Sequence, residues 1–221
     1  YYIRKGAPLE EAIEKAFPLF TGAWSLVMMD KEKLVAARDP KGIRPLSIGK
    51  GHDGYAFSSE TCAFKPLDIN PIRDVAPGEM IIVDHNGMRS VELAKGEQHL
   101  DVFEFVYFAK PDSYLLGQNV EIVRERMGKI AAQEMLNWEK PIKADVVIGT
   151  PASGSSAARG FANESGIPIA EGAIVKNNFA LRTFQKPEIK ENTNNTRSNS
   201  ARERNERAKS IMMKLSIIPE K

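Results

Sequence analysis

The stretch that most constrains the fold is Asp145–Pro168, which has the pattern of a strand, a tight loop and a helix. Val146–Ile148 is a short β-branched run, typical of a strand buried on both faces of a sheet. Residues 157–164 place apolar side chains at helical spacing. Gly166 and Pro168 follow where a helix needs a stop. This pattern predicts a strand–helix unit of an α/β protein.

The loop of this unit, Thr150–Ser156, consists of small and hydroxyl residues around Pro151 and Gly154. Such a loop before a helix presents backbone N–H groups and the positive end of the helix dipole, which suits a phosphate group. An ordinary turn without a ligand explains the same residues about as well. The loop by itself leaves both interpretations open.

The first part of the chain indicates an antiparallel, β-rich domain that follows one helix. Residues 4–17 carry apolar side chains at i, i+3 and i+4 spacing, which predicts an amphipathic helix. Turn signals such as Asp53-Gly54 and Asn86-Gly87 separate short apolar runs. We expect strands at residues 24–29, 34–37, 46–48, 55–58 and 79–83.

From Phe103 onward the pattern changes to alternating strands and helices, which implies a parallel sheet. Strands are expected at Phe103–Ala109 and Ala173–Lys176, and a long helix at Val120–Trp138. The expected apolar side of that helix consists of Ile122, Val123, Met127, Ile130, Ala131 and Met135. The change in pattern places a domain boundary near residues 95–102.

Composition excludes several classes of protein. Cys62 is the one cysteine among 221 residues, so there is no disulfide framework, and a reducing compartment is favoured. No apolar run approaches the roughly 20 residues of a membrane helix. The polar stretch 188–209 is expected to be mobile, and it lacks the interleaved aromatic residues of a nucleic-acid arm. His52, His85 and His99 have no ligand-like spacing, so a zinc site is unsupported.

Several segments, taken together and in this order, resemble the glutamine phosphoribosylpyrophosphate amidotransferase family. The resemblance runs from about Gly22 to Pro187 and is far more specific than any single motif. Its segments are Arg38–Lys50, Ser58–Phe64, Ile72–Asp84, Phe103–Ser113, Asp145–Gly154, Ser165–Pro168 and Glu171–Pro187.

The resemblance implies a chain that is α+β and then α/β. Residues 1–100 would be the C-terminal half of a type-2 glutaminase domain, part of an Ntn-hydrolase αββα sandwich. Residues 101–221 would be the N-terminal part of a type I phosphoribosyltransferase domain. The implied activity is that of a glycosyltransferase. Ammonia from glutamine displaces pyrophosphate from phosphoribosyl pyrophosphate and gives phosphoribosylamine, the first committed step of purine synthesis.

The resemblance also implies the setting and the ligands of such an enzyme. Glutamine and phosphoribosyl pyrophosphate would be its substrates and Mg²⁺ its cofactor. The complete enzyme would be a cytoplasmic homo-oligomer, usually a tetramer, with no nucleic-acid or membrane partner.

Three residues match positions that the family uses to bind phosphoribosyl pyrophosphate. Ser153 keeps the hydroxyl that lies near pyrophosphate and Mg²⁺. Lys176 and Arg182 match basic residues of a flexible loop, and such charges neutralise a diphosphate leaving group. Both could instead be solvated loop charges. Ala152 stands where the family has a carboxylate.

Other positions of the family's sites lack the expected residue. The glutaminase nucleophile is an N-terminal cysteine whose own α-amine acts as the base, but position 1 is Tyr1 and Cys62 is expected to be a packed core thiol. Asp101 occupies the position of the first cysteine ligand of an iron–sulfur cluster, so no cluster is expected. In the loop at Arg38–Arg44, an ion pair is expected to shape the backbone.

Two hypotheses follow. The chain begins at Tyr1, so it could be an incomplete amidophosphoribosyltransferase that lacks the nucleophile and the ribose-phosphate loop and is inactive alone. Alternatively, it is a non-catalytic paralogue that binds a nucleotide or a partner subunit. Ala152 and Asp101 favour the paralogue, as do Asn178 and Phe179, which replace an arginine and a tyrosine of the family. The unfamiliar insert Lys190–Lys209 favours it as well. The neighbouring coding sequence would separate the two hypotheses.

Overall fold

The computed structural model describes residues 1–174 of the chain. It divides into a compact unit of residues 1–123 and a second unit that begins at Arg124. No helix in this part of the chain is long and apolar enough to cross a membrane. The predictions for Lys176, Arg182 and residues 188–209 concern residues outside this described part.

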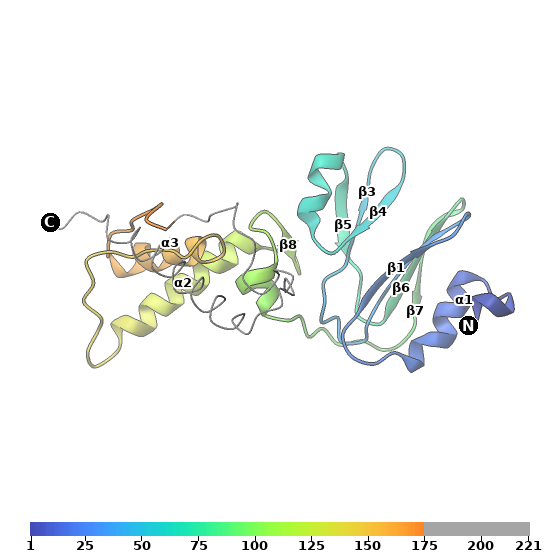
Figure 1. Ribbon diagram of the computed structural model, residues 1–221, viewed down its shortest axis with the longest axis horizontal. Helices are drawn as coiled ribbons and strands as arrows, with labels where there is room; N and C mark the ends of the chain where they lie inside the picture. Colours follow the sequence, from blue (N-terminus) through green and yellow to red (C-terminus); the bar gives the residue numbers. More distant parts are fainter. Residues whose placement is uncertain (175–221) are drawn as a thin grey trace, which may run out of the picture. The chain divides into compact units, whose positions relative to one another are not determined.

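The first unit contains one helix and two antiparallel sheets (Figure 1). Helix α1 (Leu9–Ala16) lies between the 3-10 turns η1 (Ile3–Lys5) and η2 (Phe17–Leu19). One sheet has the order β1-β2-β6-β7, with β1 (Ser25–Met29), β2 (Leu34–Arg38), β6 (Glu79–Asp84) and β7 (Gly87–Glu92). The other has the order β4-β3-β5, with β3 (Ser47–Lys50), β4 (Tyr55–Ser58) and β5 (Asn70–Asp74).

Smaller elements complete this unit. Two 3-10 turns follow β4, and a π-helical turn and a two-stranded hairpin follow β7. They are η3 (Thr61–Ala63), η4 (Lys65–Leu67), η5 (Glu104–Phe108), β8 (Tyr114–Leu115) and β9 (Gln118–Asn119).

The two central strands of the larger sheet are buried on both faces. Side chains alternate across a strand, so Val35 and Ala37 of β2 pack toward α1 whereas Ala36 packs toward the second sheet. Strand β6 divides in the same way, with Met80 toward α1 and Ile81 toward the second sheet. The unit therefore has three layers, a helix and two sheets, and the expected run of short strands behind one helix is confirmed.

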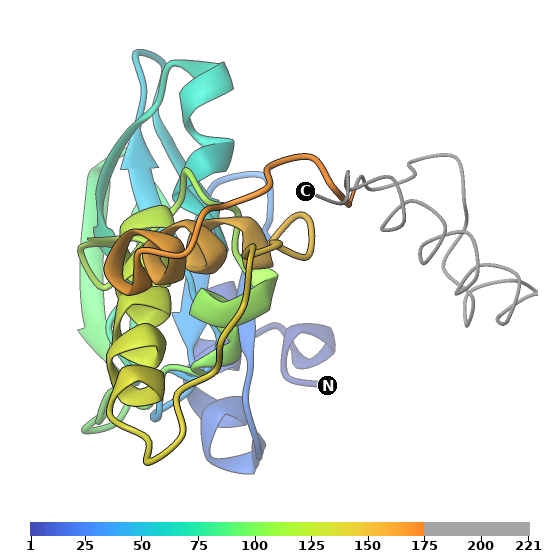
Figure 2. The same cartoon turned by 90° about the vertical axis from the view of Figure 1, so that its left-hand side faces the viewer.

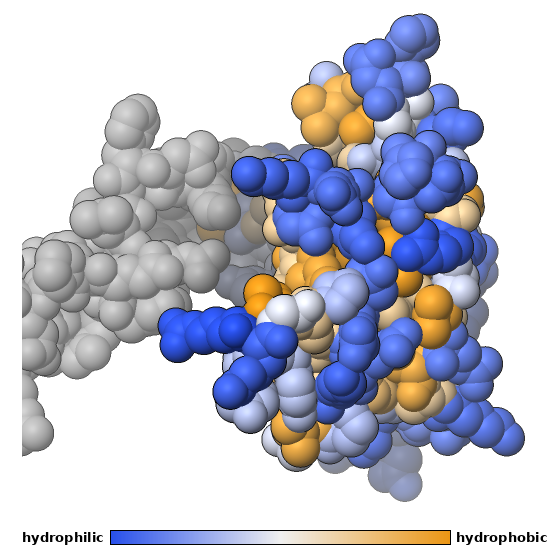
Figure 3. All heavy atoms as spheres, turned by 90° about the vertical axis from the view of Figure 1, so that its right-hand side faces the viewer, coloured by the Kyte–Doolittle hydropathy of each residue, from blue (hydrophilic) through white to orange (hydrophobic). Residues whose placement is uncertain are grey.

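Helix α1 covers one face of the larger sheet because its apolar side chains form a stripe. Leu9 and Ile13 are buried against the sheet, and Phe17 and Phe20 pack edge-on against the ring of Trp24. The other face of the helix is charged. Figure 3 shows this side of the molecule, where hydrophilic residues separate small apolar areas.

A buried arginine fixes the loop that follows β2. Arg38 is 1% exposed and donates hydrogen bonds to the carbonyl oxygens of Gly42, Arg44 and Val75 at 2.7, 2.8 and 2.6 Å. The carboxylate of Asp39 accepts hydrogen bonds from the backbone of the same loop. In the described structure Asp39 forms no ion pair with Arg38 or Arg44, and Arg44 pairs instead with Glu104 and Asp101, so the predicted ion pair within the loop is wrong. Hydrogen bonds to the backbone shape the loop instead.

The aromatic segment Phe103–Ala109 is the clearest error of the sequence prediction, because it forms the π-helical turn η5 and not a strand. The carboxylate of Asp101 accepts a hydrogen bond from the backbone N–H of Phe103, two residues on, at 3.0 Å. Most of the apolar side chains of this segment remain exposed. Aromatic residues favour strands only where neighbouring strands bury them, and no described strand pairs with this segment.

Two long helices cross closely in the second part of the chain, α2 (Val120–Leu136) and α3 (Gly154–Ser165), as Figure 2 shows. A Cβ added to Gly128 would lie 1.8 Å from the carbonyl oxygen of Ala157, and one on Gly160 would lie 1.9 Å from that of Glu125. Arg159 pairs with Glu125 at 2.8 Å across the same crossing. Glycine at both positions therefore lets the two backbones touch.

This contact explains why the expected apolar side of α2 is only partly right: Met135 is buried, but Ile122, Ile130 and Ala131 are exposed. Val120, Arg124, Gly128, Ala132 and Met135 are buried, whereas Ile122 and Ile130 are about half exposed, at 50% and 54%. Close approach of α3 selects small residues over large apolar ones at the crossing. Hydrophobicity alone did not reveal that side of the helix.

The strands expected in this unit are also shorter than predicted. Val146–Ile148 is partly exposed, and Val147 forms a single parallel bridge to Ile169. Val147 is the one residue of this run that bridges to another segment of the described residues 1–174, so the run is too short to count as a strand. The prediction of a strand buried on both faces is therefore wrong. Ala173 and Ile174 form a bend, and the rest of that predicted strand lies outside the described residues.

The helix crossing yields a prediction about stability. Gly160→Ala should lower the free energy of unfolding by about 1–3 kcal/mol, the usual cost of overpacking, although alanine is the better helix former. Chemical denaturation followed by circular dichroism measures the change. Gly154→Ala is the matched control, because its Cβ would meet its nearest neighbour at an ordinary 3.6 Å. Equal stability of the two variants would contradict the close crossing.

Candidate functional site

The loop that precedes α3 is the first candidate site. Val147 bridges to Ile169 just before the loop, with the Val147 N–H donating to the Pro168 carbonyl at 2.8 Å. The loop turns through Thr150, whose carbonyl accepts the N–H of Gly154 at 3.0 Å. The peptide between Pro151 and Ala152 is cis. The expected order of extended segment, tight loop and helix is therefore present.

Ser153 stands at the N-cap of α3, half-buried, and its side chain makes no capping hydrogen bond. The Ser153 hydroxyl therefore does not cap the helix, which leaves it available to bind a ligand. Ala152 beside it is exposed. At the other end of α3, Gly166 has φ +74° and its N–H donates to the Ala162 carbonyl at 3.0 Å, which confirms the predicted helix stop.

A carboxylate that sequence reasoning missed organises the first unit after β4. Oε2 of Glu60 accepts hydrogen bonds from the backbone N–H of Lys110 at 2.7 Å and the hydroxyl of Ser113 at 3.0 Å. The Tyr114 N–H donates to the Thr61 hydroxyl at 2.8 Å, and the Leu116 N–H donates to Asp74 at 3.0 Å. Residues 110–116 are thus tied to the end of the smaller sheet.

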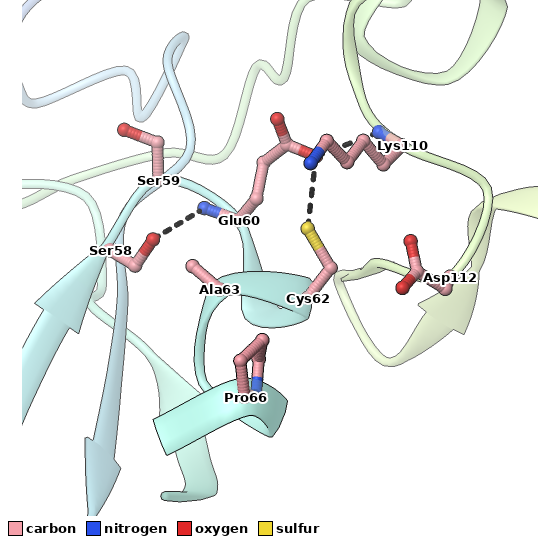
Figure 4. Close-up of a pocket in the computed structure, with 8 residues that line it drawn as sticks. All are labelled: Ser58, Ser59, Glu60, Cys62, Ala63, Pro66, Lys110 and Asp112. Carbon is pink, nitrogen blue, oxygen red and sulfur yellow. Dashed lines mark hydrogen bonds between the residues drawn. The ribbon is translucent and has the colours of Figure 1, made fainter.

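Cys62 lies beside this carboxylate and not in the apolar core. Its thiol is half-buried and donates to Glu60 Oε2 at a sulfur–oxygen distance of 3.7 Å. Figure 4 shows both side chains at a cavity of about 410 Å³ that Lys110 and Asp112 also line. The expectation of a packed core thiol is therefore wrong.

Arg44 connects the loop after β2 to η5. Its guanidinium lies 2.9 Å from Glu104 and 3.8 Å from Asp101, and it stacks over the ring of Phe108 at 5.1 Å. Glu104 is 3% exposed. Burial raises the pKa of the Glu104 carboxyl, the charge of Arg44 opposes the rise, and the negative charges of Asp101 and Glu60 add to it.

Metal-ligand geometry is not apparent in the described part of the chain. Within residues 1–174 no three His, Cys, Asp or Glu side chains gather as a metal site would require. Asp101, at the position that matches an iron–sulfur ligand, accepts a hydrogen bond from the Phe103 N–H and lies 3.8 Å from Arg44.

The raised pKa of Glu104 predicts a pH-dependent contribution to stability. A carboxyl whose pKa is higher in the folded than in the unfolded state stabilises the fold at low pH, and that contribution is lost as the pH rises through the folded-state pKa. Glu104→Gln should therefore fold as stably as the parent near pH 4, below the ordinary glutamate pKa, and more stably near pH 8. Thermal unfolding at both values checks this. The exposed Glu14→Gln is the control, and a parallel loss of stability in parent and Glu104→Gln would contradict the prediction.

Comparison with known proteins gives matches in sequence and in structure. The glutamine amidotransferase domain family matches residues 4–66. The amidophosphoribosyltransferase of Pyrococcus horikoshii is 46% identical over 181 residues, which cover 82% of this chain and 38% of that enzyme. The amidophosphoribosyltransferase of Bacillus subtilis is 39% identical over 180 residues, covering 81% of this chain and 37% of the enzyme.

Solved structures agree with the sequence matches. The chain is similar to glutamine phosphoribosylpyrophosphate amidotransferase from B. subtilis in complex with ADP and GMP, with a TM-score of 0.73 and 36% identity over 87% of this chain and 40% of that one. A structure described as the allosteric regulatory enzyme of purine biosynthesis gives the same TM-score and identity.

The chain spans between a third and two fifths of the length of these relatives. The first unit has 123 residues, so a match of 181 residues must extend well into the second unit. The similarity is therefore not confined to the helix-and-sheet unit. In sequence and in fold, this chain is related to the amidophosphoribosyltransferases over the part of those enzymes that it spans.

Proposed function

We propose that this chain contributes to an amidophosphoribosyltransferase, which uses ammonia from glutamine and phosphoribosyl pyrophosphate to make phosphoribosylamine, at the start of purine synthesis. The observation that carries the proposal is the continuous similarity to such enzymes across both units, at 39–46% identity for relatives as distant as an archaeon and a bacillus. Similarity to one unit alone would support a shared domain but not a shared reaction.

The proposal assigns a role to each unit. The layers of α1 and two sheets fit part of an Ntn-hydrolase sandwich of the glutaminase type, in which a further helical layer would cover the second sheet. The segment of Val147, the loop and α3 fit the opening of a type I phosphoribosyltransferase sheet. The boundary at residue 100 stays a prediction.

In the transferase part, the loop before α3 would hold the pyrophosphate group. The chain there offers backbone amides, the positive end of a twelve-residue helix and the Ser153 hydroxyl. Mg²⁺ would neutralise the charge that builds on the leaving pyrophosphate, and Ser153 would be one of its ligands. Lys176 and Arg182 would add positive charge from the following loop. A homotetramer in the cytoplasm remains part of this proposal.

Genetic complementation tests the overall activity. The gene in which this sequence occurs, expressed in a bacterial strain that lacks amidophosphoribosyltransferase, should restore growth without added purines. Absence of growth despite stable expression would favour the non-catalytic paralogue, which Ala152 at a usual carboxylate position first suggested.

Binding of magnesium pyrophosphate tests the loop itself. Ser153→Ala should weaken binding about tenfold or more, because a hydrogen bond or metal contact to a charged group is lost. Isothermal titration calorimetry measures the affinity. Stability should hardly change, since the Ser153 side chain makes no capping hydrogen bond.

Ser165→Ala is the matched control for this variant. Ser165 ends the same helix, and its hydroxyl donates to the Ala162 carbonyl at 3.5 Å and accepts from the Ile167 N–H at 3.3 Å. If Ser153→Ala and Ser165→Ala bind magnesium pyrophosphate with equal affinity, Ser153 is not part of the proposed site. The complementation experiment would still test the overall activity independently.

A further inference from the structure

A second cavity of the first unit lies beside Glu104 and has a volume of about 380 Å³. The start of β1, the Arg44-Pro45 segment, residues 59–60 and η5 enclose it. Its apolar walls come from Trp24, Pro45 and Phe108. A cavity of this size admits a small organic molecule, since sites for such ligands begin at about 300 Å³.

Two carboxylate oxygens at this cavity lack a hydrogen bond. Glu104 is 3% exposed, and its Oε1 accepts no hydrogen bond from residues 1–174. Arg44 lies 2.9 Å from that oxygen, close enough for an ion pair, but no N–H of the guanidinium is aligned with it. The three hydrogen bonds to Glu60 all end on its Oε2. Oε1 of Glu60 is therefore left without a donor among the described residues.

A buried acceptor without a donor is costly, by about 1–3 kcal/mol and more for a charged group. The charges that line the cavity are Glu60, Glu104 and Arg44, which sum to −1. Asp101, on the other side of Arg44, adds a further negative charge nearby. The cavity therefore has room for one positive charge. Glu104 Oε1 needs an N–H donor, whereas the Nε1–H of Trp24, also buried without a partner in the described structure, needs an acceptor. Fewer than three acidic, His or Cys side chains gather there in the described structure, which disfavours a metal ion.

We propose that this cavity binds an ammonium-type cation, either the free ion or a small primary amine, through Oε1 of Glu104 and Oε1 of Glu60. The cation's N–H groups satisfy both oxygens, and an alkyl substituent packs against Trp24 and Phe108. A quaternary ammonium has the charge but no donor, so it does not bind. This inference does not depend on the proposed transferase activity.

Bound cation favours the ionised form of Glu104, so affinity increases as the pH rises. The charged and titratable groups that face Glu104 are Arg44, Asp101 and Glu60. Burial raises the pKa of Glu104, and at lower pH the proton occupies the site that the cation requires. Cation binding is thus expected to release a proton.

Tryptophan fluorescence tests the proposal on the whole chain. Trp24 lines the cavity, and Trp138→Phe removes the other of the two tryptophans. Ammonium chloride and methylammonium chloride, at an ionic strength held constant with sodium chloride, should each change the fluorescence of Trp24 with saturation. Tetramethylammonium chloride should give no saturable change. A response to methylammonium assigns an amine ligand, and a response to ammonium alone assigns the free ion.

Glu104→Gln and, independently, Glu60→Gln should weaken binding about tenfold or more, since each loses a charge-assisted hydrogen bond. Glu14→Gln, exposed on α1, should bind like the parent. If Glu104→Gln does not fold, Glu60→Gln decides alone. The proposal is overturned if the parent shows no saturable response, if tetramethylammonium binds as well, or if the folded Gln variants keep the parent's affinity.

Discussion

Burial of β2 and β6 on both faces is the constraint on which the first unit depends. Two central strands can be covered from both sides only if their side chains alternate between two apolar layers. Val35 and Met80 meet that demand toward α1, and Ala36 and Ile81 meet it toward the second sheet. The small alanine in β2 lets the sheets approach. The loop that follows β2, which Arg38 holds, therefore starts from a strand that is fixed on both faces.

The same loop links the sheets to the segment that follows them. The Arg38 side chain donates a hydrogen bond to the backbone carbonyl of Arg44, and the Arg44 side chain in turn forms an ion pair with Glu104 in η5. Glu60 holds the next residues through Lys110 and Ser113. Residues 101–119 therefore belong structurally to the first unit. By family resemblance they were expected to open the second domain. A boundary of function and a boundary of packing need not coincide, because a connecting segment can pack on either neighbour.

Much of the fold could be predicted where local pattern and burial agree. Strand β4 (Tyr55–Ser58) has the predicted bounds, and β2 and β6 each differ from them by one residue. Strands β5 and β7 were missed because they are largely exposed edge strands with few apolar residues, and β5 contains a proline. The predictions for the aromatic run at η5 and for the apolar side of α2 failed wholly or in part because most of the large hydrophobic side chains in these two segments are exposed and are not buried against the rest of the described structure.

The candidate sites divide in a similar way. The loop before α3 was visible in the sequence because a small-residue turn between an extended run and a helix is a local pattern. The role of Glu60 was not, since its partners lie 50 and 53 residues away. A single sequence contains no signal for such a contact. Yet Glu60 is the one charged residue in a turn of small, mostly hydroxyl-bearing residues, Ser58–Ala63, and a charge in such a setting often marks a site. Hydrogen-bond donors of the protein itself offset the desolvation of Oε2 of Glu60, whereas Oε1 has no donor among the described residues. That asymmetry within one side chain separates a structural role from a binding role, and the fold here uses both.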